Sequence, residues 1–532
     1  MAPGLTPVTR EGPAASAPPV ASAHAETVRR LVLGASVALL LVVGLARPNA
    51  AQPDLDPRGW APGTLLPLTL SPTVVTGLLW MAYLLGAVAV AIGMRRQVPP
   101  LRRWWVPGGL GVAALLVAPF GSADHISYVA YGRILVSGGN PWVESPAAWH
   151  GGADPVTSRV EAPWTEEPSV YGPFATLLHG LSAWLGGPQL RQEVWVWQAV
   201  VVLAWLATRW ALRTALPRRL HGRVDVVWTL NPLVLGAGVL GAHVDVVATA
   251  LVAVAVAATA RLAGPRGAAV AGAAVALAAS TKITYGVGLV ALAVAYWLNR
   301  SRGEDGRPAR VAAHLGARLG ALLAGFLVVA GGLQAWGGGH VYDQLARSRQ
   351  AVSLATPWRP LLEALRPVIG NPEARTVVSA GAALLAVVLA VALVRMTRRD
   401  AAPDDDPRLD VAASALRVTA VLALAYSLAA PYSLPWYDVL VWAALPALVA
   451  GPVDLLALAR LTLMCLAYVP GRVLGMTPGV ESLTLGLRRE VAPWLALALW
   501  VVALAVSVVA GRGGSGRWSA PPRAGSRPTP TR

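Results

Sequence analysis

Asp124 is the acidic residue that the sequence places best for general-base chemistry. It lies four residues after Phe120, where a long apolar run ends, and His125 and Tyr128 follow it closely. Ionisable groups at the edge of an apolar segment of this length are costly, and they are usually functional. A carboxylate held there can accept a proton from a reacting hydroxyl group. The alternative is that Asp124 only caps a short amphipathic helix, which we predict because Tyr128 and Tyr131 recur at helical spacing.

Lys282 is the one lysine among 44 basic residues, and it interrupts a long apolar stretch. An ammonium group at such a depth needs an anionic partner. A lipid-linked phosphate is one candidate, and a carboxylate of the chain, Asp245 or Asp124, is the other. His243 and Asp245 follow a segment that Pro232 is expected to kink, and we expect them to emerge on the same side as Asp124.

Aromatic residues interleaved with proline and glycine form a third group of candidates. Trp164 follows a proline, Tyr171 precedes Gly-Pro, and Trp436 and Tyr437 lie in the proline-rich run 431–438. Stiff surfaces of this kind suit contact with a sugar or a lipid headgroup. The alternative is that these rings only anchor the chain at a membrane–water interface.

The composition excludes the soluble classes of protein. Of the 532 residues, 55% are hydrophobic and 13% are charged, and the mean hydropathy is +0.55, whereas a soluble domain has about 25% charged residues. The sequence is therefore not that of a soluble enzyme, a disordered protein or a nucleic-acid-binding module. The net charge of +17 fits arginine concentrated in cytoplasmic loops better than nucleic-acid binding. With one cysteine, Cys465, no disulfide framework is expected.

Apolar runs long enough to span a bilayer recur along the chain, so we predict an all-α polytopic membrane protein. We expect about 12 to 14 transmembrane helices, because several of the runs are short. The apolar segments are 31–46, 74–94, 104–120, 194–212, 224–240, 244–262, 267–281, 283–299, 311–333, 376–396, 411–430, 437–451, 454–470 and 491–511.

The arginines orient these segments. Clusters at 95–103, 213–223, 300–310 and 398–399 all fall on one side when the N-terminus is cytoplasmic. We predict a disordered cytoplasmic tail over 1–28, a membrane domain over 29–511 and a disordered basic cytoplasmic tail over 512–532. The external loops are then 121–193 and 334–375. Residues 171–185 are expected to form an interfacial or re-entrant helix in the first of them.

The motifs together resemble the GT-C class of integral-membrane glycosyltransferases. Within it, the chain is most similar to the actinobacterial polyprenol-phosphate-mannose-dependent α-1,6-mannosyltransferases of lipomannan assembly. The matching elements cover about residues 104–450 and are Asp124-His125-Ile126-Ser127-Tyr128, Tyr131-Gly132-Arg133, Asn140-Pro141-Trp142, Tyr171-Gly172-Pro173, Asn231-Pro232-Leu233, Gly241-Ala242-His243-Val244-Asp245, Lys282 and Pro435-Trp436-Tyr437.

The resemblance implies a multi-pass plasma-membrane enzyme that takes mannose from a polyprenyl-phosphate-mannose donor on the outer face and transfers it, with inversion, to a mannan or lipoglycan acceptor. Asp124 matches the position of the general base. The candidates for binding the donor phosphate are Lys282, His243, Arg349 and Arg359. The candidates for binding the acceptor or sugar are His125, Tyr128, Trp164, Tyr171, Asp245, Trp436 and Tyr437.

Some features leave alternatives open. Many relatives carry Asn-Asp or Asn-Glu after the histidine, whereas Val244 and Asp245 follow it here. Another donor sugar, such as arabinose or glucose, and a lipid-linked sugar flippase or transporter are the competing functions. A flippase does not explain the acid-rich loop that carries Asp124. We expect no organic cofactor. No cluster of metal-ligating residues in the sequence points to a divalent metal ion, but a requirement for such an ion stays open. No nucleic-acid partner is expected.

Overall fold

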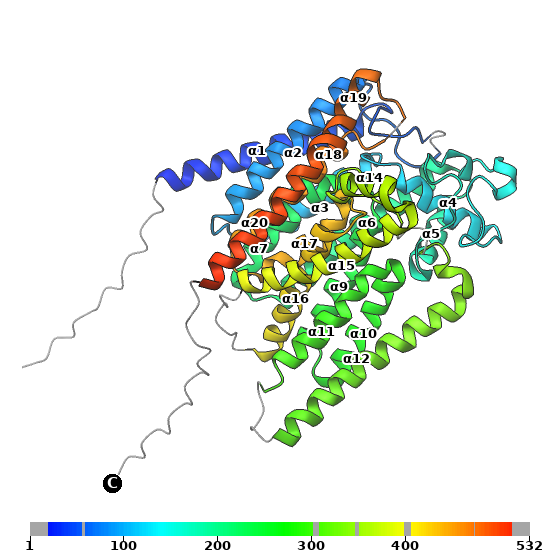
Figure 1. Ribbon diagram of the computed structural model, residues 1–532. Helices are drawn as coiled ribbons and strands as arrows, with labels where there is room; N and C mark the ends of the chain where they lie inside the picture. The colour runs from blue at the N-terminus through cyan, green and yellow to red at the C-terminus, as the bar shows by residue number, and fades with distance from the viewer. Residues whose placement is uncertain are drawn as a thin grey trace, which may run out of the picture.

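The chain is built of α-helices, as the sequence predicts. The computed structural model describes residues 20–55, 59–301, 308–345, 350–397, 406–472 and 474–512. Within these ranges there is no β-strand, only an isolated bridge between Asn49 and Gln52. Long helices lie side by side to form a bundle, and shorter helices gather at one end of it (Figure 1).

Eight of the described helices are long and apolar enough to cross a membrane, and a bent pair would make nine. They are α1 (Val20–Leu45), α2 (Pro72–Met94), α6 (Leu190–Ala215), α9 (Val244–Arg261), α12 (Pro308–Gly337), α15 (Asn371–Met396), α16 (Pro407–Ala429) and the continuous stretch Pro478–Ala510, which comprises α19 (Pro478–Gly486), η10 (Leu487–Val491) and most of α20 (Ala492–Arg512). The protein is therefore an all-α polytopic membrane protein.

The predicted 12 to 14 crossings exceed this number because several apolar segments form short helices. The segment predicted at 104–120 gives only α3 (Trp105–Leu116), and the one at 437–451 gives α17 (Val439–Ala444). Twelve helical residues extend about 18 Å, which is well short of a hydrocarbon core of about 30 Å. Two other predicted segments form the short helices α11 (Val287–Leu298) and α18 (Pro452–Tyr468). Helix α10 (Gly264–Thr281) is as long as α9 but is not among the eight candidate spans.

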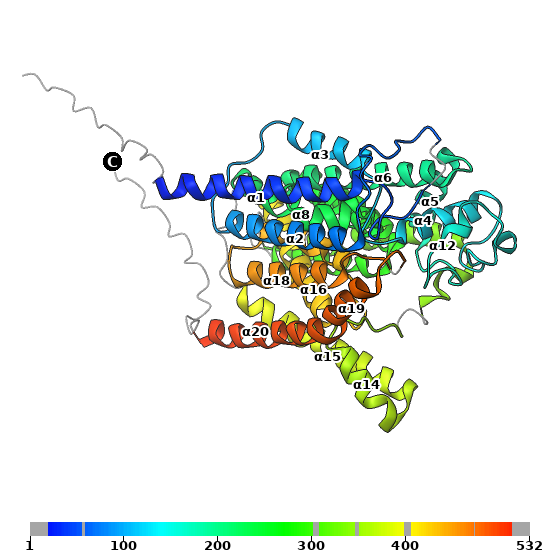
Figure 2. The same ribbon diagram turned by 90° about the horizontal axis from the view of Figure 1, so that it is seen from above.

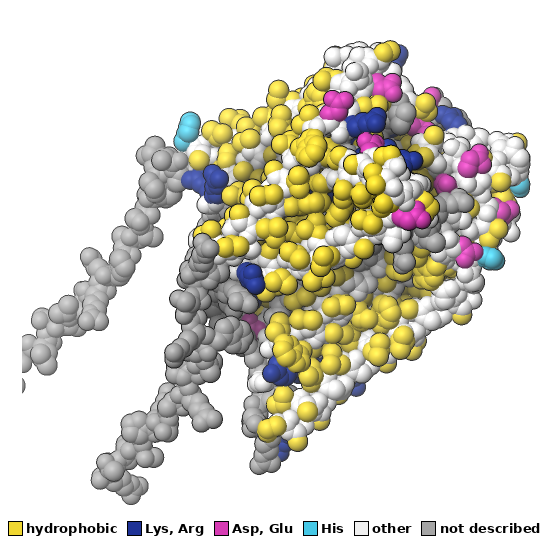
Figure 3. Space-filling view, in the orientation of Figure 1, with side chains coloured by type: hydrophobic (Ala, Val, Ile, Leu, Met, Phe, Trp, Pro, Cys, Tyr) yellow, Lys and Arg dark blue, Asp and Glu magenta, His cyan; other side chains and the backbone are white. Residues whose placement is uncertain are grey.

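The two predicted tails meet the structure at their inner boundaries. Helix α1 begins at Val20, so the disorder predicted over 1–28 is wrong for residues 20–28. Arg512 is the last residue of α20, and the rest of the tail predicted over 512–532 lies outside the described residues. The hydrophobic side chains cover the middle of the helices on the face in Figure 3, and most of the acidic side chains there gather near the end that carries α4 and α19.

Glycine allows close helix packing in the middle of the bundle. A Cβ atom on Gly272 of α10 would lie 2.0 Å from the backbone oxygen of Leu322, and one on Gly325 of α12 would lie 2.1 Å from that of Ala269. Both distances are impossible for a real side chain, so the α10–α12 contact requires glycine. Such small-residue contacts are common where helices pack in a membrane.

The segment before His243 is a broken helix. It consists of α7 (His221–Val224), η4 (Asp225–Thr229), α8 (Pro232–Val234) and η5 (Leu235–Leu240), and its halves meet at 41°. The predicted kink at Pro232 is confirmed. The buried Asp225 binds Arg209 at 2.9 Å and Arg213 at 3.0 Å, which fixes the first half against α6.

The first large loop folds into short helices at one end of the bundle (Figure 2). They are α4 (Asp124–Val136), η1 (Trp149–Gly152), η2 (Thr157–Arg159) and α5 (Pro173–Gly186). The helix predicted over 171–185 corresponds to α5. Helix α4 is buried on all sides over most of its length and is not the amphipathic surface helix expected from its tyrosines, because α5 and α6 pack against it.

Candidate active site

A cavity of about 560 Å³ opens where α4, the loop before α5, the α10–α11 turn, α15 and α16 meet. Its volume lies within the range of ligand pockets, which is about 300–1,000 Å³. Six of the residues singled out from the sequence line it: Asp124, Trp164, Tyr171, Lys282, Trp436 and Tyr437. Residues up to 313 positions apart in the chain thus line the same cavity.

Asp124 is the first residue of α4, and its carboxylate faces the cavity. The residue at the N-cap position is Ala123, so the capping role does not account for Asp124. Its side chain is 18% exposed, and Oδ2 lies 3.7 Å from Nδ1 of His243. Burial raises the pKa of Asp124 to about 7; the charge of Lys282 opposes this shift, and the charge of Asp245 adds to it. A carboxyl group with this pKa is suited to act as a base near neutral pH.

Lys282 lies in the turn between α10 and η6 (Ile283–Gly286) and is 18% exposed to the cavity. Its Nζ is 2.7 Å from Oδ1 of Asp245 and 3.6 Å from the ring centroid of Tyr437. The hydroxyl of Tyr285 donates to the same Oδ1 at 3.0 Å. The partner of Lys282 in the structure is therefore a carboxylate of the chain, the alternative considered from the sequence, and the lysine still reaches the cavity wall.

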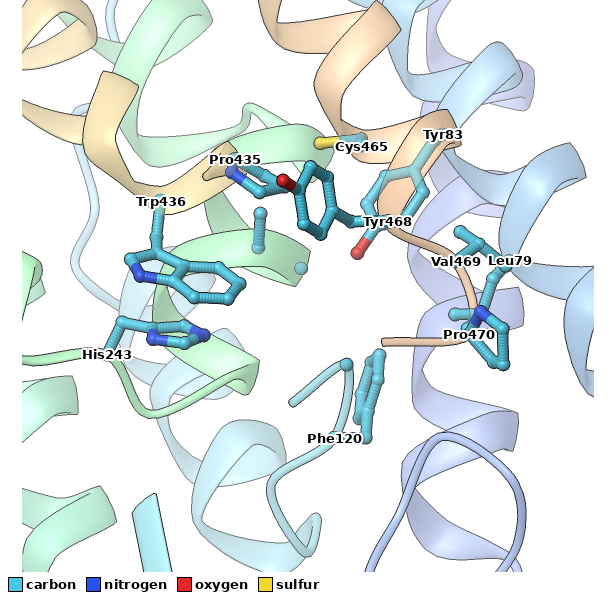
Figure 4. A pocket seen from close by; sticks show the side chains of 13 residues that line it. Leu79, Tyr83, Phe120, His243, Pro435, Trp436, Cys465, Tyr468, Val469 and Pro470 are labelled. Carbon is cyan, nitrogen blue, oxygen red and sulfur yellow. The ribbon is translucent and has the colours of Figure 1, made fainter. Parts of the chain in front are cut away.

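His243 follows a strained turn. Ala242 has a φ of 53°, which is unfavourable for a residue with a Cβ atom. The indole Nε1 of Trp197 donates to the carbonyl of Ala242 at 2.8 Å and holds the turn in place. The imidazole of His243 stacks on Trp436 at 3.5 Å with an interplanar angle of 13° (Figure 4). Strain of this kind persists where the surrounding packing enforces it, and it often marks a functional position.

The imidazole does not line the large cavity itself but supports Trp436, which does. Nε2 of His243 is 3.3 Å from Oγ of Ser122, and Nδ1 is 3.4 Å from the hydroxyl of Tyr128. Behind the His243–Trp436 stack lies a small cavity of about 20 Å³, bounded also by Tyr83 and Phe120 (Figure 4).

His125 and Tyr128, predicted to contact sugar, lie below the cavity surface. His125 is fully buried, and neither ring nitrogen has a hydrogen-bond partner among the described residues. Burial lowers the pKa of His125 to about 3, so the ring is neutral at physiological pH. Tyr128 packs edge-on against Tyr171 at 5.1 Å and stacks on His179 at 5.3 Å. Tyr128 thus supports Tyr171, which lines the cavity, and His125 lies buried behind the lining residues.

Of the two arginines predicted to bind phosphate, the structure describes one. Arg359 lies in α14 (Trp358–Ile369), does not line the cavity, and forms an ion pair with Glu363 at 2.7 Å. Arg349 lies outside the described residues.

Sequence reasoning missed one wall of the cavity. This wall is made by Ser379, Ala382, Ala383 and Ala386 of α15, together with Tyr426 of α16. In a chain rich in alanine these positions carry no distinguishing signal. The contact of Tyr285 with Asp245 was not predicted either, although Tyr285 follows Lys282 by three residues. The described residues contain no group of three or more His, Cys, Asp and Glu side chains that could hold a metal ion.

A family model described as "Alpha-(1->6)-mannopyranosyltransferase, N-terminal domain" matches residues 31–299, which include Asp124, Asp245 and Lys282. A probable alpha-(1->6)-mannopyranosyltransferase of Mycolicibacterium smegmatis is 29% identical over 238 residues, which are 41% of this chain and 41% of that protein. The chain thus aligns with less than half the length of this curated relative. The crystal structure of ArnT from Cupriavidus metallidurans bound to undecaprenyl phosphate matches 83% of the chain at 16% identity, but its TM-score of 0.30 supports no structural inference.

Proposed function

Because the chain belongs to the α-(1→6)-mannopyranosyltransferase family, we propose that it is an inverting glycosyltransferase of the GT-C type. It moves mannose from polyprenyl-phosphate-mannose to a mannan or lipoglycan acceptor at the outer face of the plasma membrane. The observation that carries the proposal is the Asp124 carboxyl group, with its pKa raised to about 7, in a cavity that also contains Lys282.

Asp124 is the general base. It removes the proton from an acceptor hydroxyl while that oxygen attacks C1 of mannose and the bond from C1 to the phosphate oxygen breaks. A single displacement inverts the anomeric carbon, so one base suffices and no covalent intermediate with the enzyme forms. The negative charge that develops on the leaving phosphate requires a nearby cation.

Lys282 is that cation. Its ammonium is held by Oδ1 of Asp245 on one side and by the face of Tyr437 on the other. These contacts position it before the donor binds, and preorganised charge stabilises a transition state without further rearrangement. Oδ2 of Asp245 has no hydrogen-bond partner among the described residues, which leaves room for one more donor group at this end of the site.

The rest of the cavity is divided between two kinds of surface. Trp164, Tyr171 and Trp436 provide the aromatic faces that suit a sugar ring. The alanines of α15 provide an apolar wall, and Ala383 is exposed. This wall suits the first isoprene units of a lipid donor. The outer-face location is supported by the arginines at 95–96 and 218–223, which line a cavity at the start of α16, whereas Asp124 lines the cavity at its end.

A transfer assay tests the proposal directly. Purified full-length protein is given radiolabelled polyprenyl-phosphate-mannose and short α-mannoside acceptors, and parallel reactions use polyprenyl-phosphate-arabinose and polyprenyl-phosphate-glucose. We expect an α-linked mannosyl product with the first donor alone. The Asp124→Asn variant should form this product about 10²- to 10⁴-fold more slowly. The matched control is Glu166→Gln, which removes an exposed acid from the same loop. Equal transfer by Asp124→Asn and the parent protein would contradict the assignment of the base.

A further inference from the structure

A second large cavity, of about 700 Å³, lies at the other end of the bundle. Helix α16 connects the two sites: Asp410 and Ala413, near its start, line this cavity, whereas Tyr426, near its end, lines the first. Sixteen residues of helix separate Asp410 from Tyr426, which corresponds to about 24 Å. The two cavities therefore face opposite sides of a bilayer whose hydrocarbon core is about 30 Å thick.

The walls of this cavity are strongly basic. Among its lining residues Asp410 is the only acid, and the basic residues are Arg95, Arg96, Arg218, Arg219, Arg223 and Arg417. Arg223 is already paired with Asp454 at 2.6 Å. Within the described part of the chain, Arg95, Arg218 and Arg417 form no ion pair, and Arg417 donates only to the carbonyl of Ala447, at 3.1 Å. Three arginines of this cavity therefore have no acidic partner among the residues that the structure describes.

The walls of this cavity are held in place by contacts that do not involve Arg95, Arg218 or Arg417. The loop from Arg95 to Leu101 presses on Gly222, where a Cβ atom would lie 1.8 Å from the carbonyl oxygen of Val98. The backbone N–H of Leu101 donates to Oδ2 of Asp225 at 2.8 Å. On the other wall, Arg223 donates to the carbonyl of Leu445 at 3.3 Å. The shape of the cavity is therefore set by the packing of the elements around it.

Apolar side chains lie between the arginines. Val98, Leu409, Leu448 and Val449 line the same cavity, so a ligand there meets both cations and hydrocarbon. The tendency of arginine to accumulate in cytoplasmic loops explains basic residues at this end of the protein. It does not explain a preformed cavity in which three of them have no acidic partner in the described part of the chain. Basic pockets between transmembrane helices on this side of a membrane suit the headgroups of anionic lipids.

We propose that this cavity is a binding site for an anionic phosphate group, with the phosphodiester headgroup of a bilayer phospholipid as its occupant. Arg95, Arg218 and Arg417 bind the phosphate oxygens, and the apolar residues contact the start of the acyl chains. A soluble phosphate ester shares the same chemistry without the acyl chains. The site is separate from the transfer site and holds its ligand whatever sugar the enzyme transfers.

Lipid titration followed by native mass spectrometry tests this proposal on the purified full-length protein. The probes are dioleoyl phosphatidylglycerol, dioleoyl phosphatidylcholine as the zwitterionic control, and glycerol 3-phosphate as the soluble ester. The cavity variant is Arg95→Gln/Arg218→Gln/Arg417→Gln. The matched control is Arg261→Gln/Arg266→Gln/Arg395→Gln, which removes the same charge from exposed arginines at the same end but outside the cavity.

We expect the cavity variant to bind phosphatidylglycerol about 100-fold more weakly, because each arginine contributes roughly 1 kcal/mol to binding an anionic lipid surface. The control variant should keep the affinity of the parent. If the triple variant does not fold, Arg218→Gln alone should weaken binding about fivefold. Competition by glycerol 3-phosphate that depends on the three arginines would assign the phosphate to a soluble ester. Equal binding by all variants, or equal weakening in the control, would overturn the proposal.

Discussion

The pH dependence of transfer offers the sharpest test of Asp124. A general base must be ionised to work, and burial raises the pKa of this carboxyl group to about 7. The rate constant kcat/KM, which reports the free enzyme, should therefore fall as pH decreases through 7. About half of the enzyme is ionised at pH 7, about a tenth at pH 6 and about a hundredth at pH 5. We expect kcat/KM to drop about fivefold from pH 7 to pH 6 and about fiftyfold from pH 7 to pH 5.

The two buried histidines beside Tyr128 do not produce this profile. Burial lowers the pKa values of His125 and His179 to about 3, so both rings stay neutral throughout the range from pH 5 to pH 8. Binding of the donor adds a negative phosphate near Asp124, which disfavours the ionised carboxylate. The apparent pKa seen in kcat, which reports the enzyme–donor complex, should therefore lie above that seen in kcat/KM.

The measurement is the initial rate of mannosyl transfer with labelled donor at subsaturating and saturating concentrations, in buffers from pH 5 to pH 8.5. Asp124→Asn should lose about 10²- to 10⁴-fold of activity and show no titration in this range. Glu166→Gln should follow the profile of the parent protein. A flat profile in the parent, or the same titration in Asp124→Asn, would show that another group is the base.

Three further predictions concern the remaining parts of the site. Lys282→Ala should raise the donor KM or Kd at least tenfold and Lys282→Arg should restore it only in part, because a planar guanidinium does not replace a compact ammonium between Asp245 and Tyr437; donor titration on monodisperse protein measures this. Ala383→Trp should fill the apolar wall and weaken donor binding, whereas Ala380→Trp, on the same helix but outside the cavity lining, should not. In a Cys465→Ala background, a cysteine at 166 should react with a membrane-impermeant maleimide in intact cells, and a cysteine at 395 should react only after permeabilisation.

The candidate site was predictable where a residue was chemically exceptional. Asp124 is an acid at the end of an apolar run, and Lys282 is the one lysine of the chain, in an apolar stretch. The structure brings both to one cavity with Trp164, Tyr171, Trp436 and Tyr437. The proline and glycine residues next to these aromatic residues made them candidates, because stiff turns hold aromatic side chains in place at the ends of helices.

Arg359 was predicted to bind phosphate from its charge and its place in a predicted external loop. In the structure it does not line the cavity, and Glu363, one helical turn later, pairs with it. Local pairing of this kind is visible in the sequence as an i, i+4 spacing. The alanine wall of α15 and the strained turn at Ala242 could not be found in this way, since they depend on tertiary packing and backbone geometry.

The number of crossings was harder to predict for a different reason. Hydropathy identifies apolar segments but not their helical length, and α3 and α17 are apolar without being long enough to span. Helices that stop short leave polar backbone groups at depth, which is tolerated only where protein or a cavity covers them. Such interruptions are found at the α10–η6 turn with Lys282 and in the η8 turn (Pro435–Asp438) with Trp436. The turns that interrupt the apolar helices therefore also carry residues of the candidate site.

The charges at the site explain why its base needs a high pKa. Before transfer, the proposed complex contains ionised Asp124, the Asp245–Lys282 pair and a donor phosphodiester with one negative charge. After transfer, the polyprenyl phosphate is a monoester with up to two negative charges, and Asp124 has become neutral by taking the proton of the acceptor. The total charge of the buried site is then unchanged. In an environment where uncompensated charge is costly, a base with a low pKa would stay ionised beside the new phosphate charge, whereas a carboxyl group poised near 7 gives up its charge as the phosphate gains one.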